Sequence, residues 1–229
     1  MTTIGVLNQK GGVGKSTLAT NLAHTYATQG TRVLLVDADP QSKSATRWSS
    51  AREIEPLFPV IGMAKPTLHK DLPAVSRNYD ITIIDGAPQL AEIGRSVILA
   101  SDMVVIPVQP SPYDVWSAAD TVALIREAQV FKESLKAVFA VNRKIANTAI
   151  GRDVTEALAQ YEIPTLKTHL VQRVVYAESA AQGLAVEEME PDSAATKEIR
   201  KLAAEIRKAG DDYDVMLARV ALEIGGANG

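Results

Sequence analysis

The chain is predicted to be a three-layer α/β protein, with a mostly parallel, twisted sheet and helices on both of its faces. Short apolar runs alternate with segments of helical length along nearly all of its 229 residues. The runs at residues 33–36 and 81–84 consist of Val, Leu, Ile and Thr only, as expected for strands covered on both faces. The first run, at residues 4–7, leads through a glycine-rich loop into a helix-length segment.

The predicted elements follow one another in a regular order. Strands are predicted at residues 2–7, 32–37, 60–63, 81–85, 103–108 and 137–141, with a weaker one near 165–169. Helices are predicted near residues 15–29, 41–52, 67–77, 89–100, 114–131, 150–160, 173–181 and 192–209, and Trp48 and Trp116 are interpreted as their packing residues. No repeat or flexible linker interrupts this order, which predicts one domain over residues 1–209. Residues 210–229 are predicted to be a C-terminal helix with a frayed end, in the same domain.

Composition excludes several classes of protein. The formal net charge is −3, so nucleic-acid binding would require a local basic patch rather than an overall positive field. The chain has no cysteine, which excludes disulfides, a thiolate nucleophile and cysteine-ligated iron–sulfur clusters. A signal segment and an apolar run of bilayer-spanning length are not found either, so a cytoplasmic location is expected.

The loop at residues 10–16 predicts a phosphate-binding site. Its sequence is Lys-Gly-Gly-Val-Gly-Lys-Ser, between a predicted strand and a predicted helix. Glycines let successive backbone N–H groups approach phosphate oxygens at a helix N-terminus, where the helix dipole also favours anions. Lys15 is expected to reach the β- and γ-phosphates, and the Ser16 hydroxyl to hold Mg²⁺. The common motif has a glycine at the position of Gln9, and this loop begins instead with a second lysine, Lys10.

Three aspartates follow predicted strands. Asp37 and Asp39 lie at the end of one strand, and Asp85 ends another. Ligands of open α/β sheets bind at the carboxyl ends of strands, so these carboxylates are expected to face the loop. Asp85 is interpreted as the acid that supports the Mg²⁺ shell, and Asp37 or Asp39 as a group that orients water or binds a metal-bound water. The alternative is that each aspartate only caps a helix or turn, a role that Asp39 before Pro40 fits.

These residues resemble the ParA/MinD group of P-loop ATPases, whose deviant Walker A motif is K-G-G-x-G-K-[ST]. The match is Lys10 through Ser16, supported by the stretches at 37–41 and 84–86. The resemblance covers about residues 2–209 and implies a P-loop NTPase fold, with ATP and Mg²⁺ as cofactors and slow intrinsic hydrolysis of ATP to ADP and phosphate. Within the group, the stretches at 106–114, 141–144 and 172–176 are similar to the small, ParF-like ParA proteins of plasmid partition.

The resemblance implies a role for each residue of the site. In the group, the first lysine of the loop crosses the interface of a nucleotide-sandwich dimer and contacts the partner's ATP, a role that falls here to Lys10; the alternative is a solvated loop lysine. The expected catalytic residues are Lys10, Lys15 and Asp39, and the expected metal-site residues are Ser16, Asp37 and Asp85. The expected ATP-binding residues are Lys10, Gly11, Gly12, Val13, Gly14, Lys15, Ser16 and Thr17 at the phosphates and Pro107, Asn142 and Arg143 at the adenine.

The resemblance also implies non-specific DNA binding. The expected contacts are Arg173, Lys197, Arg200 and Lys201, and Arg207 and Lys208 lie on the same predicted helix as the last three. Cations that meet phosphates give additive, steeply salt-dependent binding. The alternative is that these charges are the solvated face of an amphipathic helix.

Together these features predict a ParA-type ATPase for plasmid partition. ATP is expected to close a homodimer that binds nucleoid DNA, and a centromere-binding adaptor protein is expected to stimulate hydrolysis. The alternatives are the positioning of a protein cargo or a chromosome by the same kind of ATPase, or an ATP-dependent ligase on the same scaffold. Membrane attachment is not expected, because residues 211–219 hold three aspartates and one arginine.

Overall fold

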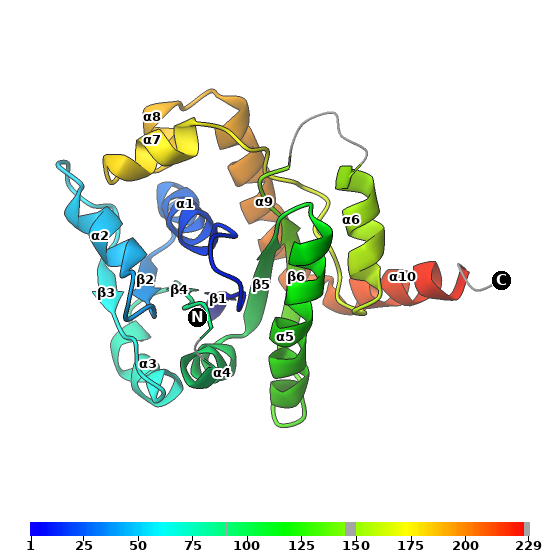
Figure 1. Ribbon diagram of the computed structural model, residues 1–229. Helices are drawn as coiled ribbons and strands as arrows, with labels where there is room; N and C mark the ends of the chain where they lie inside the picture. Colours follow the sequence, from blue (N-terminus) through cyan, green and yellow to red (C-terminus); the bar gives the residue numbers. More distant parts are fainter. Residues whose placement is uncertain (90, 145–149, 227–229) are drawn as a thin grey trace.

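The fold is built on a six-stranded sheet whose strands all run parallel (Figure 1). The computed structural model describes residues 1–89, 91–144 and 150–226. The strands are β1 (Thr2–Val6), β2 (Val33–Asp37), β3 (Val60–Gly62), β4 (Ile81–Asp85), β5 (Met103–Val108) and β6 (Lys136–Val141). Their order across the sheet is β3-β2-β4-β1-β5-β6, which confirms the predicted α/β fold.

The register of the sheet brings two aspartates to one level. β1 lies between β4 and β5, and it pairs Val6 with Asp85 of β4. Asp85 is in turn paired with Asp37 of β2. Both carboxylates therefore lie at the carboxyl ends of neighbouring strands, beside the start of the glycine-rich loop, where open α/β sheets bind ligands.

Helices connect the strands. They are α1 (Lys15–Thr28), α2 (Ser44–Ser50), α3 (Leu68–Ser76), α4 (Ala91–Ala100), α5 (Pro112–Gln129), α6 (Ile150–Ala159), α7 (Val175–Ala181), α8 (Val186–Met189), α9 (Ala194–Asp211) and α10 (Tyr213–Gly226). In the part of the chain that the structure describes, none of them is both long enough and apolar enough to cross a lipid bilayer.

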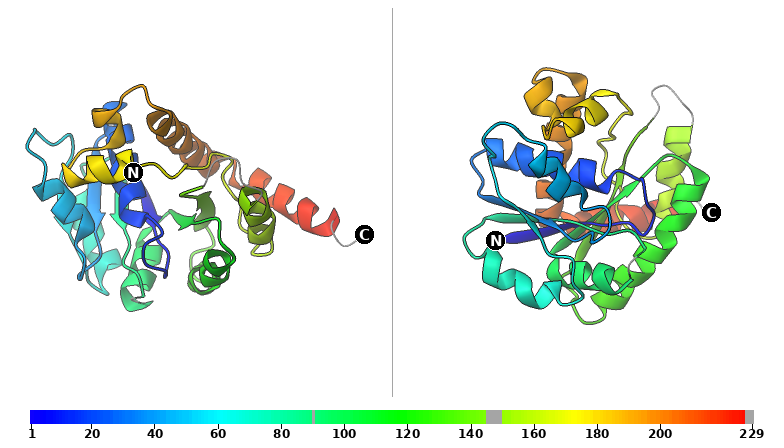
Figure 2. Two further views of the ribbon diagram at one scale, coloured as in Figure 1. Left: turned by 45° about the horizontal axis from the view of Figure 1, so that its top comes forward. Right: turned by 60° about the vertical axis from the view of Figure 1, so that its left-hand side comes forward.

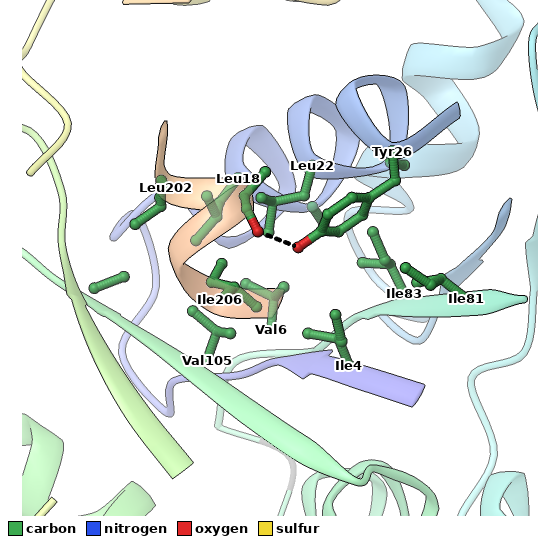
Figure 3. Packing of buried hydrophobic residues seen from close by; sticks show 14 of the residues in the cluster. Ile4, Val6, Leu18, Leu22, Tyr26, Ile81, Ile83, Val105, Leu202 and Ile206 are labelled. Carbon is green, nitrogen blue, oxygen red and sulfur yellow. Dashed lines mark hydrogen bonds between the residues drawn. The ribbon is translucent and has the colours of Figure 1, made fainter. Parts of the chain in front are cut away.

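Helices cover both faces of the sheet (Figure 2). On one face, α1 and α9 pack against the strands, and the Tyr26 hydroxyl of α1 donates a 2.9 Å hydrogen bond to the carbonyl of Ala203 in α9 (Figure 3). On the other face lie α3, α4 and α5. Along β2, Val33 and Leu35 belong to the first core, and Leu34 and Val36 belong to the second. Alternate side chains are buried on opposite faces, which explains the continuous apolar run.

The weak strand expected near residues 165–169 is not a regular strand. Among the described residues, one isolated bridge, between Thr165 and Phe139, pairs this segment with β6. The backbone N–H groups of Lys167 and Thr168 donate to the Glu205 carboxylate of α9 rather than to a neighbouring strand. A side chain of α9 thus takes hydrogen bonds that would otherwise extend the sheet.

The helices differ from the prediction by a few residues at several ends, and in three further respects. The helix expected at 41–52 begins only at Ser44, because residues 39–42 form a turn on the Asp39 carboxylate. The short helix α8 was not predicted from the sequence. The C-terminal helix extends to Gly226, and residues 227–229 of the expected frayed end lie outside the described residues.

Candidate phosphate-binding site

The loop between β1 and α1 has the backbone shape that its glycines predict. Gly12 and Gly14 have φ angles of 77° and 92°, in the left-handed region that side chains disfavour. A Cβ at Gly14 would also lie 2.2 Å from Nδ2 of Asn142. A Cβ at Gly12 would meet no atom within 4 Å, so this part of the loop is open. The loop leads directly into α1, whose N-cap Gly14 supplies no side-chain cap, so the first N–H groups of the helix can face an anion.

Two side chains from other segments and one from the start of the same loop hold it in place. Asn142, after β6, donates from Nδ2 to the Val13 carbonyl at 2.8 Å. Gln109, after β5, donates from Nε2 to the Gly12 carbonyl at 2.9 Å. Oδ1 of Asn8 accepts from the N–H of Lys10 at 2.9 Å. The loop is therefore shaped before any ligand binds, which lowers the entropic cost of binding.

Residues expected at the adenine have other contacts here. Pro107 is buried in β5, and its carbonyl accepts from Nδ2 of Asn8. Both polar atoms of the Asn142 amide have partners: Nδ2 donates to the Val13 carbonyl, and Oδ1 accepts from the N–H of Arg143. Arg143 itself is exposed. Adenine contact by these residues stays a prediction, whereas Asn142 has a visible role in fixing the loop.

The two loop lysines have different surroundings. Lys15 is 7% exposed and donates from Nζ to the Lys10 carbonyl at 2.8 Å. Burial lowers its pKa, and the nearby charges of Asp85 and Asp39 oppose that shift. The Lys10 side chain is 35% exposed, and its Nζ forms a 2.9 Å ion pair with Asp114 in the first turn of α5. Lys15 thus points back over the loop, and Lys10 is bound to another element of its own chain.

Two of the three aspartates are occupied by backbone donors. Asp37 accepts from the N–H of Asp39 at 3.1 Å and from that of Thr46 at 2.8 Å, which ties β2 to α2. Asp39 accepts from the N–H groups of Gln41 and Ser42 and from the Ser42 hydroxyl. Burial raises the pKa of Asp39, but these hydrogen bonds outweigh it and hold the pKa below its usual value. Both carboxylates therefore make cap or turn contacts, as the alternative describes, and their roles at Mg²⁺ and at the attacking water stay predictions.

Asp85 has a different environment. Among the described residues, neither of its buried carboxylate oxygens has a hydrogen-bond partner. Burial raises the pKa of Asp85 to about 7, the Ser16 hydroxyl and Lys15 lower it, and Asp37 and Asp39 raise it further. A buried carboxylate without donors, beside a serine hydroxyl, fits a Mg²⁺ shell. The described residues form no cluster of three or more His, Cys, Asp or Glu suited to a metal, so phosphate oxygens and water would supply the other ligands.

The basic residues expected to contact DNA divide into two pairs. Arg173 forms a bidentate ion pair with Glu198, at 2.6 and 2.7 Å, and Arg200 lies 2.7 Å from Glu187. Lys197 and Lys201 are exposed on α9, and neither has an ion pair with a described residue. The two lysines are thus free to meet an anion, and the two arginines are already neutralised by their own chain.

Sequence reasoning missed Asp114 and a pair of aromatic residues beside it. Asp114 is 4% exposed and forms the ion pair with Lys10, a contact that its position in the sequence does not reveal. Tyr113 and Trp116 are 72% and 64% exposed, with ring centroids 5.4 Å apart in an edge-to-face arrangement. The packing interpretation was therefore wrong for Trp116, although Trp48 is buried and stacks on Phe58. Helical periodicity alone does not reveal which side of an N-terminal turn faces solvent.

Known proteins resemble the chain in sequence and in fold. Residues 4–186 match the family described as "CobQ/CobB/MinD/ParA nucleotide binding domain". The chain is 32% identical over 187 residues to maintenance of carboxysome distribution protein A of Halothiobacillus neapolitanus, which covers 80% of this chain and 86% of that protein. It is 29% identical over 234 residues to the chromosome-partitioning ATPase Soj of Thermus thermophilus, over 89% and 94% of the two chains. A variant of Cyanothece McdA in complex with ATP has a similar fold, with a TM-score of 0.72 at 18% identity over 90% and 96% of the two chains.

Proposed function

Because the chain belongs to the CobQ/CobB/MinD/ParA family of nucleotide-binding domains, we propose that it is a cytoplasmic ParA-type ATPase that positions a large cargo. One relative is named for the distribution of carboxysomes and another for chromosome partitioning. These names favour a protein assembly or a chromosome as cargo over the plasmid that the ParF-like stretches predict. A plasmid stays a candidate cargo, with less support. An ATP-dependent ligase stays a candidate activity, also with less support.

The phosphate loop and Asp85 carry this proposal. ATP is bound by the backbone of residues 10–16, and the Lys15 ammonium exchanges the Lys10 carbonyl for phosphate oxygens. Ser16, and Asp85 through water, would hold Mg²⁺, which would supply positive charge against the β- and γ-phosphates. The hydrogen bonds of Asp39 leave it beside Lys15, where it orients the attacking water.

Lys10 makes the bound state depend on a second copy. In the single protomer its ammonium is held by Asp114. In an ATP-bound homodimer the same ammonium leaves Asp114 for the ATP of the partner, where charge develops on the transferred phosphoryl group. The exposed rings of Tyr113 and Trp116 adjoin Asp114, and aromatic residues of this kind are common at the centre of protein interfaces. This position supports an interface that forms around Lys10.

The ATP dimer then binds DNA non-specifically, and a partner protein attached to the cargo stimulates hydrolysis and release. Lys197 and Lys201 are the cations best placed for DNA phosphates, since they lack ion pairs among the described residues. Hydrolysis breaks the dimer, because the γ-phosphate that Lys10 contacts is lost. The protein acts as a switch whose state is set by its nucleotide.

A DNA-binding titration tests this function. We expect binding to duplex DNA with ATP and Mg²⁺, little binding with ADP or without nucleotide, and a steep loss of affinity at the higher of two salt concentrations. Equal binding in all three nucleotide states would contradict the switch. The cargo is tested by imaging the tagged protein in its native cell: positioning that persists after plasmid curing supports a protein or chromosome cargo, and positioning that disappears supports a plasmid.

A further inference from the structure

A groove lies outside the nucleotide site, between α6, α9, α10 and the segment at residues 163–169. Its volume is about 710 Å³. Its floor is mostly apolar, formed by Ile163, Leu166, Ala204, Ala209, Met216 and Val220. Figure 2 shows α10 leaving the end of α9 beside α6 and extending away from the body of the fold. The groove is therefore open to a partner along the exposed side of these helices.

Cations border this apolar floor. Lys167, Lys201 and Arg219 line the groove, and none of them has an ion pair with a described residue. Both acids that line the groove already have partners: the two oxygens of Glu205 accept the N–H groups of Lys167 and Thr168, and Asp212 pairs with Lys208. The border is thus locally basic on a chain whose net charge is −3. An occupant with carboxylates would be attracted, and a basic one would be repelled.

The shape of the groove favours a helical peptide over DNA. The groove follows one face of α9 from Lys201 through Ala204 and Lys208 to Asp212. From Lys201 to Asp212, the residue that caps α9, eleven rises of 1.5 Å make this face about 16 Å long, or three turns of helix. Small side chains at Ala159 and Ala204 leave room for larger ones of a partner. Phosphate groups gain nothing from an apolar floor, whereas an amphipathic helix uses the floor and the charged border together.

We propose that this groove binds an amphipathic helix of a partner protein, about three turns long, with an apolar face flanked by Asp and Glu. The apolar face fills the space over Ala204, Met216 and Val220. The flanking carboxylates pair with Lys167, Lys201 and Arg219. The site is separate from the phosphate loop, so the partner and the nucleotide do not compete for the same residues, although Lys201 also belongs to the proposed DNA contacts.

The test uses a fluorescein-labelled 15-residue peptide, with leucines at helical spacing i, i+3, i+4, i+7 and i+11 and glutamates beside them. Ala204→Phe fills the groove at an exposed position, and Lys201→Glu reverses a border charge. Lys197→Glu, on the same helix but outside the groove, is the matched control. We expect each groove variant to weaken peptide binding by about tenfold or more, and the control to change it by less than about twofold. Thermal unfolding followed by circular dichroism checks that all three variants fold.

Two further measurements keep the outcomes apart. With ¹³C-methyl methionine, the peptide is expected to shift the signal of Met216 and leave the other four methionines unchanged. A peptide with lysine in place of glutamate is expected to bind at least about tenfold more weakly. Equal binding of the two peptides, or an unchanged Met216 signal, would overturn the proposal. Equal losses of peptide affinity in Lys197→Glu and Lys201→Glu, with no loss in Ala204→Phe, would also overturn the proposal. That result would mean that the lysines of this face attract any anionic ligand, as they would DNA.

Discussion

The phosphate-loop edge of the sheet and the exposed face of α9 both carry charged residues, but their charges are organised differently. At the loop edge, strand register places Asp37 and Asp85 at one level beside the glycines. On α9, helical spacing alone does not decide which cations stay free, because Arg200 pairs with a glutamate of α8. The local sequence pattern shows which residues end a strand. The packing of distant elements, in contrast, decides which surface residues form ion pairs.

The largest expected effect concerns the loop edge. Lys15→Ala removes the ammonium expected at the β- and γ-phosphates, so ATP affinity should fall at least about 100-fold, the loss of two charge-assisted hydrogen bonds. Isothermal titration calorimetry with ATP and Mg²⁺ measures this, with Lys43→Ala as a control at a lysine outside the loop. Wild-type affinity in Lys15→Ala would show that the loop does not bind phosphate.

The variant Asp39→Asn tests whether the Asp39 carboxylate acts in ATP hydrolysis as well as holding the turn at residues 39–42. The asparagine oxygen still accepts from the N–H groups of Gln41 and Ser42, so the turn should persist. Without the carboxylate, ATP hydrolysis should slow by about 100-fold or more, and the ATP dimer should stay on DNA. Phosphate release measured with DNA present gives the result. ADP release at the wild-type rate would leave Asp39 with the capping role only.

Asp85 should make the free energy of unfolding depend on pH. Burial raises its pKa to about 7, so the folded protein keeps a proton that the unfolded chain loses near pH 4. The folded state then binds more protons, and stability without nucleotide should fall by roughly 4 kcal/mol as the pH rises from about 4 to about 7, and level off above that. Urea unfolding at several pH values measures the slope. Asp85→Asn should flatten it, and an unchanged slope would contradict this origin.

The smallest expected effects lie on α9. Lys197→Ala and Lys201→Ala should each weaken DNA binding by about threefold and reduce the salt slope by about 1, because each removes one phosphate contact. Arg200→Ala should change it less, since Glu187 already neutralises that guanidinium. Titration of the ATP-bound protein with duplex DNA compares the three variants. A larger loss in Arg200→Ala than in the lysine variants would show that the Glu187 ion pair opens on DNA.

Much of the fold follows from the sequence because its signals are local. The runs at β2 and β4 are buried on both faces and end in aspartates, so the parallel sheet and its binding edge could be predicted together, whereas the order of the strands could not. The segment near residues 165–169 pairs with β6 only at its start, because Glu205, far along the chain, accepts the N–H groups of Lys167 and Thr168. The domain extent over residues 1–209 stays a prediction.

The same distinction divides the candidate site. The spacing of residues 10–16 predicts a phosphate loop, and in the structure Gly12 and Gly14 have the left-handed backbone angles that such a loop needs. The sequence could not reveal that Asp85 alone of the three aspartates lacks donors among the described residues, or that Asp114 holds Lys10. Both facts depend on contacts between segments about 100 residues apart or on burial, which no local pattern encodes.

Lys10 carries the central claim, because the proposed switch requires its ammonium to leave Asp114 for the ATP of a second copy. Sedimentation velocity of Lys10→Ala with ATP and Mg²⁺, with ADP and without nucleotide tests this most directly, with calorimetry to confirm that the variant binds ATP. The account predicts a wild-type dimer with ATP only, and a Lys10→Ala monomer in all three states despite near-normal ATP affinity. A Lys10→Ala dimer that forms with ATP as readily as wild type would contradict it.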